Sequence, residues 1–266
     1  MLYLISTPIG NLQDITLRAL ETLKKCDYIL CEDTRHTIFL LKEYQIKVPL
    51  YSFHQFNEKK SEDKIIQDLK QGMTVGLVSD AGTPGICDPG ESLVKRCYQE
   101  NIPLTSLPGA CAFATALSLT PFSKERVQFL GFLPKKIEER KKELAQSLLY
   151  RGTTLFYESP QRVVDTLKML PSFMKVCVFR ELSKLYEEHR LGSVEELIQY
   201  YEANTPRGEC VMAVESLNWN YQELSLIEHV SYIQELFKLS LSDSIKIVAD
   251  IQGIPKRDVY HAVHIE

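Results

Sequence analysis

Short apolar runs alternate with amphipathic segments through the first 118 residues. The runs at 3–6, 28–31, 50–53, 74–79 and 104–107 have the length of buried strands. Between and after them, apolar residues recur at helical spacing, which predicts helices at 16–25, 37–43, 58–71, 91–101 and 110–118. Strands and helices that alternate across short loops favour a largely parallel α/β sheet.

The alternation continues in a second block, which ends near residue 217. It predicts strands at 127–132, 153–157, 176–180 and 209–215, and helices at 137–150, 160–170 and 194–201. A last segment predicts helices at 226–239, 242–252 and 257–263, with a helix-turn-helix-like turn at Gly253. We therefore expect an α/β protein with an N-terminal domain at 1–118, a second α/β domain at 119–217 and a C-terminal helical segment at 218–266.

Composition and charge exclude several classes of protein. The net charge of −4 and the pI near 5.9 disfavour binding of bare nucleic acid by charge alone, so RNA contacts would need local basic patches. No apolar run reaches about 18 residues and the N-terminus lacks signal-peptide features, which predicts a cytoplasmic protein without a membrane span. Seven cysteines without a CxxC pair indicate reduced thiols and no structural zinc.

Four loops follow predicted strands, where ligands bind in open α/β sheets. The segment 79–90 holds three glycines and two prolines, and its exposed backbone groups suit a small polar ligand. The segment 107–112 leads into a helix N-terminus through small residues, which leave room for a flat ring. The segment 7–12 carries a glycine but lacks the dinucleotide fingerprint, and in 157–162 Ser159 has the position of an N-cap before Pro160.

Two charged clusters also follow strands. Residues 32–37 form the first, and residues 180–184 form the second, with further charges at 187, 188 and 190. Such runs are usually solvated loops, but each of these directly follows a strand, which favours a functional role. Arginine matches phosphate geometry, so Arg35, Arg180 and Arg190 are candidate RNA contacts.

The motifs together resemble those of one known family. In chain order they read TPIGNLQDITLRAL, EDTRHT, SDAGTPGICDPG, LPGACA, GFLP, FYESPQR, RELSKLYEE and RGEC. The chain is similar over about residues 1–217 to the bacterial 16S rRNA ribose 2′-O-methyltransferases of the tetrapyrrole-methylase-like superfamily. The resemblance implies methylation of a decoding-centre cytidine in the 30S subunit, and a homodimer. It also implies a two-domain fold that binds S-adenosyl-L-methionine in the interdomain cleft.

The resemblance further implies which residues contact the cofactor. From the first domain these are Pro8, Ile9, Asp80, Ala81, Gly82, Thr83, Ala110, Cys111 and Ala112. From the second they are Tyr157, Glu158, Ser159, Leu182, Gly208 and Cys210. The reaction needs no metal. Candidates for the base that takes the ribose proton are Asp33, His36, Glu158 and Lys184, and the sequence does not choose among them.

The sequence departs from the family pattern at several positions. Cysteine replaces the expected serine at Cys87 and Cys111, and Cys111 lies in a contact loop, where it would alter cofactor affinity. Gln161 stands where histidine is usual, which argues against a catalytic histidine there, and Ser183 replaces threonine. The stretch 118–123 lacks the usual Ser-Gly.

Two alternatives remain open. The first is a methyltransferase of the same superfamily that acts on a tetrapyrrole or a protein side chain. The second is a non-catalytic ribosome-binding factor that keeps the cofactor as a structural ligand.

Overall fold

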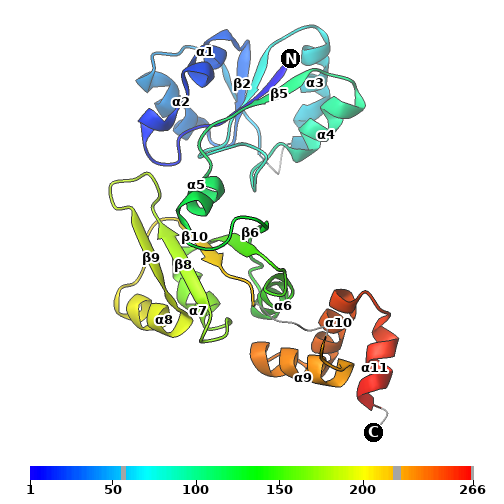
Figure 1. Ribbon diagram of the computed structural model, residues 1–266. Coiled ribbons are helices and arrows are strands. Elements are labelled where there is room, and N and C mark those ends of the chain that lie inside the picture. The colour runs from blue at the N-terminus through cyan, green and yellow to red at the C-terminus, as the bar shows by residue number, and fades with distance from the viewer. Residues whose placement is uncertain (55–57, 218–222, 265–266) are drawn as a thin grey trace. The chain divides into compact units, whose positions relative to one another are not determined.

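A computed structural model describes residues 1–54, 58–217 and 223–264. The chain divides into two compact units (Figure 1). Unit 1 comprises residues 1–115 together with 182–185, and unit 2 comprises residues 116–181 and 186–266. The expected start of the C-terminal segment at residue 218 lies outside the described residues.

Unit 1 contains a parallel five-stranded sheet, as the sequence predicted. Its strands run in the order β3-β2-β4-β1-β5, and every pair of neighbours is parallel. They are β1 (Leu2–Ile5), β2 (Tyr28–Cys31), β3 (Leu50–Ser52), β4 (Val75–Leu77) and β5 (Leu104–Leu107). The helices α1 (Leu17–Lys25) and α2 (Thr34–Glu43) cover one face, and α3 (Glu58–Lys70) and α4 (Glu91–Gln99) cover the other (Figure 1).

Both faces of this sheet are apolar, which explains the continuous hydrophobic runs in the sequence. Leu2, Leu30 and Leu77 belong to one buried cluster, whereas Ile5 and Ile29 belong to the cluster on the opposite face. Because parallel strands all end at the same edge, the loops after β1, β2, β4 and β5 gather there.

The helix after β2 begins three residues earlier than predicted. Asp33 caps α2, and its side chain accepts a hydrogen bond from the Arg35 backbone N–H. Arg35 and His36 therefore lie in the first helical turn rather than in a loop.

Unit 2 contains a different sheet, in the order β6-β7-β10-β8-β9. Within it β6 and β7 are parallel, whereas β7–β10, β10–β8 and β8–β9 are antiparallel. The strands are β6 (Val127–Phe132), β7 (Thr153–Glu158), β8 (Lys175–Arg180), β9 (Glu188–Ser193) and β10 (Cys210–Val214). The sequence analysis predicted no strand at 188–193, where the structure has β9. The strand β9 lies at the sheet edge, where charged side chains are common and hide the strand signal.

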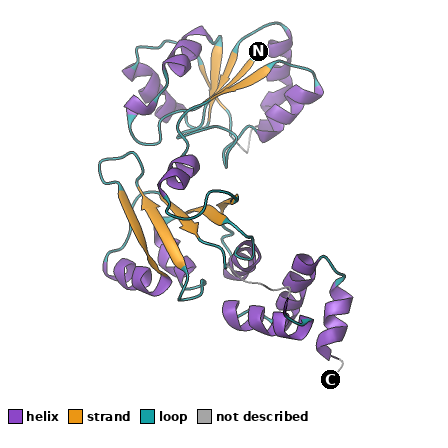
Figure 2. Cartoon of the chain, in the orientation of Figure 1, coloured by secondary structure: helices purple, strands orange, loops and turns teal. Residues whose placement is uncertain are grey.

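Helices complete unit 2 (Figure 2). The predicted helix at 160–170 is a 3-10 turn, η2 (Pro160–Arg162), followed by the short α7 (Val163–Leu167). The others are α6 (Ile137–Ser147), α8 (Val194–Ala203), α9 (Leu226–Phe237), α10 (Leu241–Gln252) and α11 (Lys256–His264). The last three pack on one another, and α9 and α10 also pack on α6, where Lys142 pairs with Asp243 at 2.7 Å. No helix in the described part of the chain is long and apolar enough to cross a membrane.

Two further elements follow strands of unit 1. A 3-10 turn, η1 (Leu12–Asp14), follows β1 and is capped by the side chain of Asn11. The helix α5 (Ala112–Leu119) follows β5 and leads out of unit 1.

Candidate active site

The loop after β1 is fixed to the loop after β4 by paired backbone hydrogen bonds. The Thr7 N–H donates to the Gly82 carbonyl at 2.8 Å, and the Gly82 N–H donates back at 3.0 Å. The Thr7 hydroxyl donates to the Ser79 carbonyl at 3.1 Å. Gly82 has a φ of +86°, a conformation that favours glycine. These bonds hold Pro8 and Ile9 beside the segment 80–83.

A hydroxyl pair ties the same two loops to the loop after β5. The Thr83 hydroxyl donates to the Ala110 carbonyl at 3.0 Å and lies 2.9 Å from the Ser6 hydroxyl. Ser6 in turn donates to the Leu107 carbonyl at 3.1 Å. A Cβ added to Gly109 would lie 2.6 Å from the Ser6 Cβ, so only glycine allows this approach. The loops that carry Pro8, Asp80 and Ala110 thus form one cradle, which we call the loop cradle.

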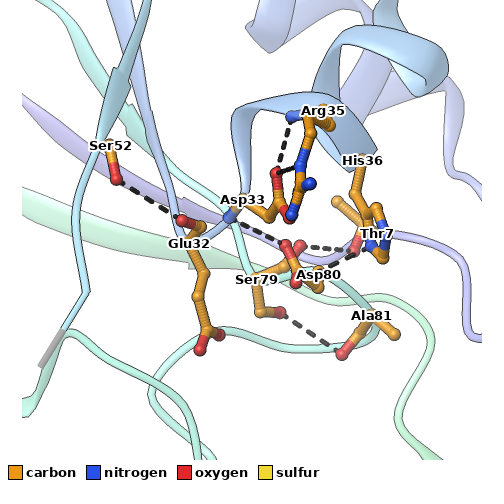
Figure 3. Close-up of polar contacts among 9 residues, drawn as sticks. All are labelled: Thr7, Glu32, Asp33, Arg35, His36, Ser52, Ser79, Asp80 and Ala81. Carbon is orange, nitrogen blue, oxygen red and sulfur yellow. Dashed lines mark hydrogen bonds and ion pairs between the residues drawn. The ribbon is translucent and has the colours of Figure 1, made fainter.

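Acidic side chains border the loop cradle (Figure 3). The Asp33 backbone N–H donates to the Asp80 carboxylate at 3.1 Å, and His36 Nδ1 lies 3.7 Å from the other Asp80 oxygen. The Arg35 Nε and one of its terminal nitrogens donate hydrogen bonds to the Asp33 carboxylate, the terminal nitrogen at 2.6 Å. The Glu32 carboxylate points away from this pair (Figure 3).

The carboxyl groups near the loop cradle have pKa values shifted in opposite directions. The Arg35 side chain holds the pKa of Asp33 at about 2, chiefly through its hydrogen bonds. Burial, followed by the charges of Glu32 and Asp80, raises the pKa of Asp88 to about 6. Burial and the charge of Asp80 likewise raise the pKa of Glu32. The region therefore concentrates negative charge and would favour a cationic ligand.

Residues 182–185 belong to unit 1 although they follow a strand of unit 2. Leu182 is buried there, and the Ser183 hydroxyl contacts the Asp14 carboxylate. A Cβ on Gly10 would lie 2.2 Å from Lys184 Cγ, so the Lys184 stem lies against Gly10. The last three residues of the RELSK motif, 182–184, therefore lie in unit 1 with the TPIGN motif.

The remaining predicted cofactor residues lie in unit 2. Glu158 is buried, and it accepts hydrogen bonds from the Thr166 hydroxyl at 2.6 Å and the Ser159 N–H at 2.8 Å. Arg162 forms an ion pair with Glu158 at 2.5 Å, so both Glu158 oxygens take part in structural contacts. The Ser159 side chain makes no capping bond, although it occupies the N-cap position. Tyr157 packs edge-on against Phe129.

The RGEC motif also has a local structural role. Gly208 has a φ of +81°, and a Cβ there would collide with the Glu181 carboxylate. Glu181 accepts from the Glu209 N–H at 2.9 Å, which closes the turn before Cys210.

Arginine side chains gather at the end of β8. Arg180 donates through Nε and a terminal nitrogen to Glu188, at 3.1 and 3.0 Å. Arg190 pairs with Glu188 at 3.1 Å and stacks on Tyr200, with 3.3 Å between the guanidinium carbon and the ring centroid. These bonds lower the pKa of Glu188 even though its burial opposes the shift.

An open pocket of about 360 Å³ lies beside Arg180 in unit 2. We call it the arginine pocket, and its lining comprises Arg180, Glu188, Tyr200, Tyr201, Asn204, Thr205, Pro206 and Arg207. Apart from Arg180 and Glu188, sequence reasoning missed these residues. The adjacent tyrosines and the Thr-Pro-Arg turn after a helix were the available signal. Across the described ranges, no group of His, Cys, Asp or Glu side chains is arranged to hold a metal ion.

Comparisons with known proteins agree with the fold. The family model described as Tetrapyrrole (Corrin/Porphyrin) Methylases matches residues 1–198. Solved structures of similar fold include a diphthine synthase and a cobalt precorrin-4 methyltransferase. The first has a TM-score of 0.65 at 12% identity and covers 91% of this chain and 98% of its own. The second has a TM-score of 0.58 at 16% identity, and the match covers 80% of this chain and 94% of the other.

Curated relatives are closer in sequence. A protein named ribosomal RNA small subunit methyltransferase I from Halalkalibacterium halodurans is 40% identical, covering 100% of this chain and 95% of its own. Its namesake from Haemophilus influenzae is 38% identical, covering 100% and 98%. The chain therefore belongs to the tetrapyrrole methylase family, within the group of its ribosomal RNA small subunit methyltransferase I relatives.

Proposed function

We propose that this methyltransferase transfers a methyl group from S-adenosyl-L-methionine to the ribose 2′-hydroxyl of a decoding-centre cytidine of 16S rRNA in the 30S subunit. The observation that carries the rRNA assignment is full-length identity of about 40% to relatives that are named for that substrate class. We further expect a cytoplasmic homodimer.

The loop cradle fits the proposed cofactor. A flat ring and a ribose need close approach to the backbone, which Gly82 and Gly109 allow because a side chain at either position would fill the space or strain the turn. The side chains of Ala110 and Ala112 are small, and the Asp80 carboxylate is a hydrogen-bond acceptor for hydroxyl or amine donors. The acidic border suits the net positive charge of the cofactor.

The cofactor, when bound, supplies an electrophilic methyl group on a sulfonium. The ribose oxygen forms the new O–C bond while the C–S bond breaks, the sulfur keeps the electron pair, and the 2′-hydroxyl proton leaves. The protein therefore has to orient the two reactants and accept one proton.

The geometry separates the four candidate bases. The Asp33 carboxylate accepts hydrogen bonds from Arg35, and the buried Glu158 carboxylate pairs with Arg162, so the oxygens of both are occupied by other donors. His36 is largely exposed beside the Asp80 carboxylate of the loop cradle, and the imidazole of histidine is the most common general base in enzymes. We propose His36 as the base, with Lys184 as the second candidate.

Turnover tests this proposal. Purified protein and cofactor with a labelled methyl group should label 30S subunits from a strain that lacks the modification, and nuclease digestion should place the label on a cytidine ribose. Subunits that already carry the modification are the matched control and should stay unlabelled. No label on the first subunits, or label on a base, would overturn the assignment, and label on a tetrapyrrole would favour the first alternative.

The base assignment has its own test. His36→Gln should lower kcat by about 100-fold while the cofactor Kd stays unchanged, because general-base catalysis contributes about 10²- to 10⁴-fold. A kcat within about twofold of the unchanged protein would transfer the role to Lys184 or to water.

A further inference from the structure

The arginine pocket is built from side chains that do not take part in the loop cradle. It lies in unit 2, between the end of β8, the start of β9 and the end of α8. Its volume of about 360 Å³ is at the lower end of the range for small-ligand sites. That volume suits a single nucleotide and excludes a duplex.

One lining atom is buried without a hydrogen bond. Tyr201 is 2% exposed, and among the residues that the structure describes its hydroxyl has no hydrogen-bond partner. Buried hydroxyl groups are almost always satisfied, and an exception calls for an explanation such as an absent ligand. The hydroxyl thus indicates a polar group that binds in this pocket.

The charges of the lining favour an anion. Arg180 has five N–H donors, of which three contact Glu188 and the Arg207 carbonyl, so donors remain. The Arg207 side chain is exposed and has no ion-pair partner within residues 1–54, 58–217 and 223–264. Glu188 is already neutralised by Arg180 and Arg190. The pocket therefore keeps a net positive charge.

We propose that the arginine pocket binds one nucleotide of the substrate RNA strand. Arg180 and Arg207 hold the phosphodiester, and Asn204, Thr205 and the Tyr201 hydroxyl bind the ribose hydroxyls. This assignment deepens the proposed function and rests on it. It identifies single-stranded RNA as the form of substrate that is recognised, because both the phosphate and the 2′-hydroxyl are read.

Tyr201→Phe and Arg207→Ala test the pocket in the full-length protein. Each should raise the KM for 30S subunits about three- to tenfold with kcat within about twofold, and Arg207→Ala should also reduce the salt slope of RNA binding by about one. The cofactor Kd should not change. Lys24→Ala removes an equal charge from an exposed position of unit 1 and is the matched control.

Direct binding gives a readout that does not depend on methyl transfer. A fluorescent single-stranded RNA oligonucleotide should bind more tightly than DNA of the same sequence, and Tyr201→Phe should narrow that difference without lowering the melting temperature. If the protein methylates 30S subunits but both variants behave like Lys24→Ala, the pocket assignment fails while the proposed function stands. If the unchanged protein methylates no rRNA, the proposed function fails first.

Discussion

The loop cradle of unit 1 and the arginine pocket of unit 2 are built in opposite ways. In the cradle, backbone groups and two hydroxyls hold three loops together, and glycines provide the space. In the pocket, the lining includes two arginines, a glutamate and two tyrosines. The contrast matches a small ligand of fixed shape on one side and a flexible polyanion on the other.

The difference also lies in how each site is supported. The cradle sits at the edge of a parallel sheet that is buried on both faces, and hydrogen bonds join its loops to one another. The pocket sits beside an edge strand and a helix end, where side chains adjust without moving the core. Small changes in the cradle should therefore have larger effects than charge changes in the pocket.

Gly109→Ala should give the largest effect. The new Cβ would lie 2.6 Å from the Ser6 Cβ, so the backbone must move, and we expect the free energy of unfolding to fall by about 2 to 3 kcal/mol. Chemical denaturation measures this loss. In a Ser6→Gly background the colliding atom is absent, so the same substitution should cost much less. An equal cost in both backgrounds would contradict the contact.

Thr83→Val should separate the two sites. It removes the hydroxyl that joins Ser6 and Ala110 at nearly constant volume, and the cofactor Kd should rise about tenfold, the effect of losing about one buried hydrogen bond. Calorimetry with S-adenosyl-L-methionine measures it. Arg207→Ala is the control and should leave that Kd unchanged. If Arg207→Ala raised the cofactor Kd and Thr83→Val did not, the assignment of the cofactor to the loop cradle would be wrong.

These regions also differ in how far the sequence predicts them. The cradle was predictable because parallel strands end at one edge, and runs such as Ser79–Gly85 carry glycines and prolines that a plain turn does not need. The pocket was not, because the charges of β9 concealed an edge strand. Its arginines were individually suspected as phosphate ligands, but no periodicity indicates that Tyr201 and Arg207 lie beside Arg180.

The pH dependence of ligand binding to the loop cradle should depend on the charge of the ligand. The pKa of Asp88 is about 6, so raising the pH through 6 ionises Asp88 and should strengthen binding of cationic S-adenosyl-L-methionine about fivefold. S-adenosylhomocysteine lacks the sulfonium charge, so its Kd should change far less. Asp88→Asn should abolish the difference. Equal pH profiles for both ligands would show that the acidic border does not sense the sulfonium.

The same group sets a direction for stability. Because its pKa is raised above the ordinary value of 3.8, the folded state binds the proton more tightly than the unfolded chain, and stability from Asp88 is lost as pH rises from 3.8 through about 6. Asp88→Asn should therefore raise the melting temperature more at pH 7.5 than at pH 4. The opposite order would exclude burial as the cause of the shift.

Asp33→Asn should give the smallest effect, a change in the KM for 30S subunits. It compares an arginine that has an ion-pair partner, Arg35, with Arg207. Asp33 grips Arg35, whose side chain is 87% exposed, whereas the described residues offer Arg207 no such partner. Asparagine still caps α2, so the helix should persist while the Arg35 guanidinium loses its anionic partner. The KM for 30S subunits should then fall about twofold, because one more cation faces the phosphates.

Arg35→Ala should change KM less than Arg207→Ala, since the charge of Arg35 is already neutralised by Asp33. A large drop in kcat for Asp33→Asn would instead make Asp33 the base, and the ion pair with Arg35 would then serve the chemistry rather than RNA binding.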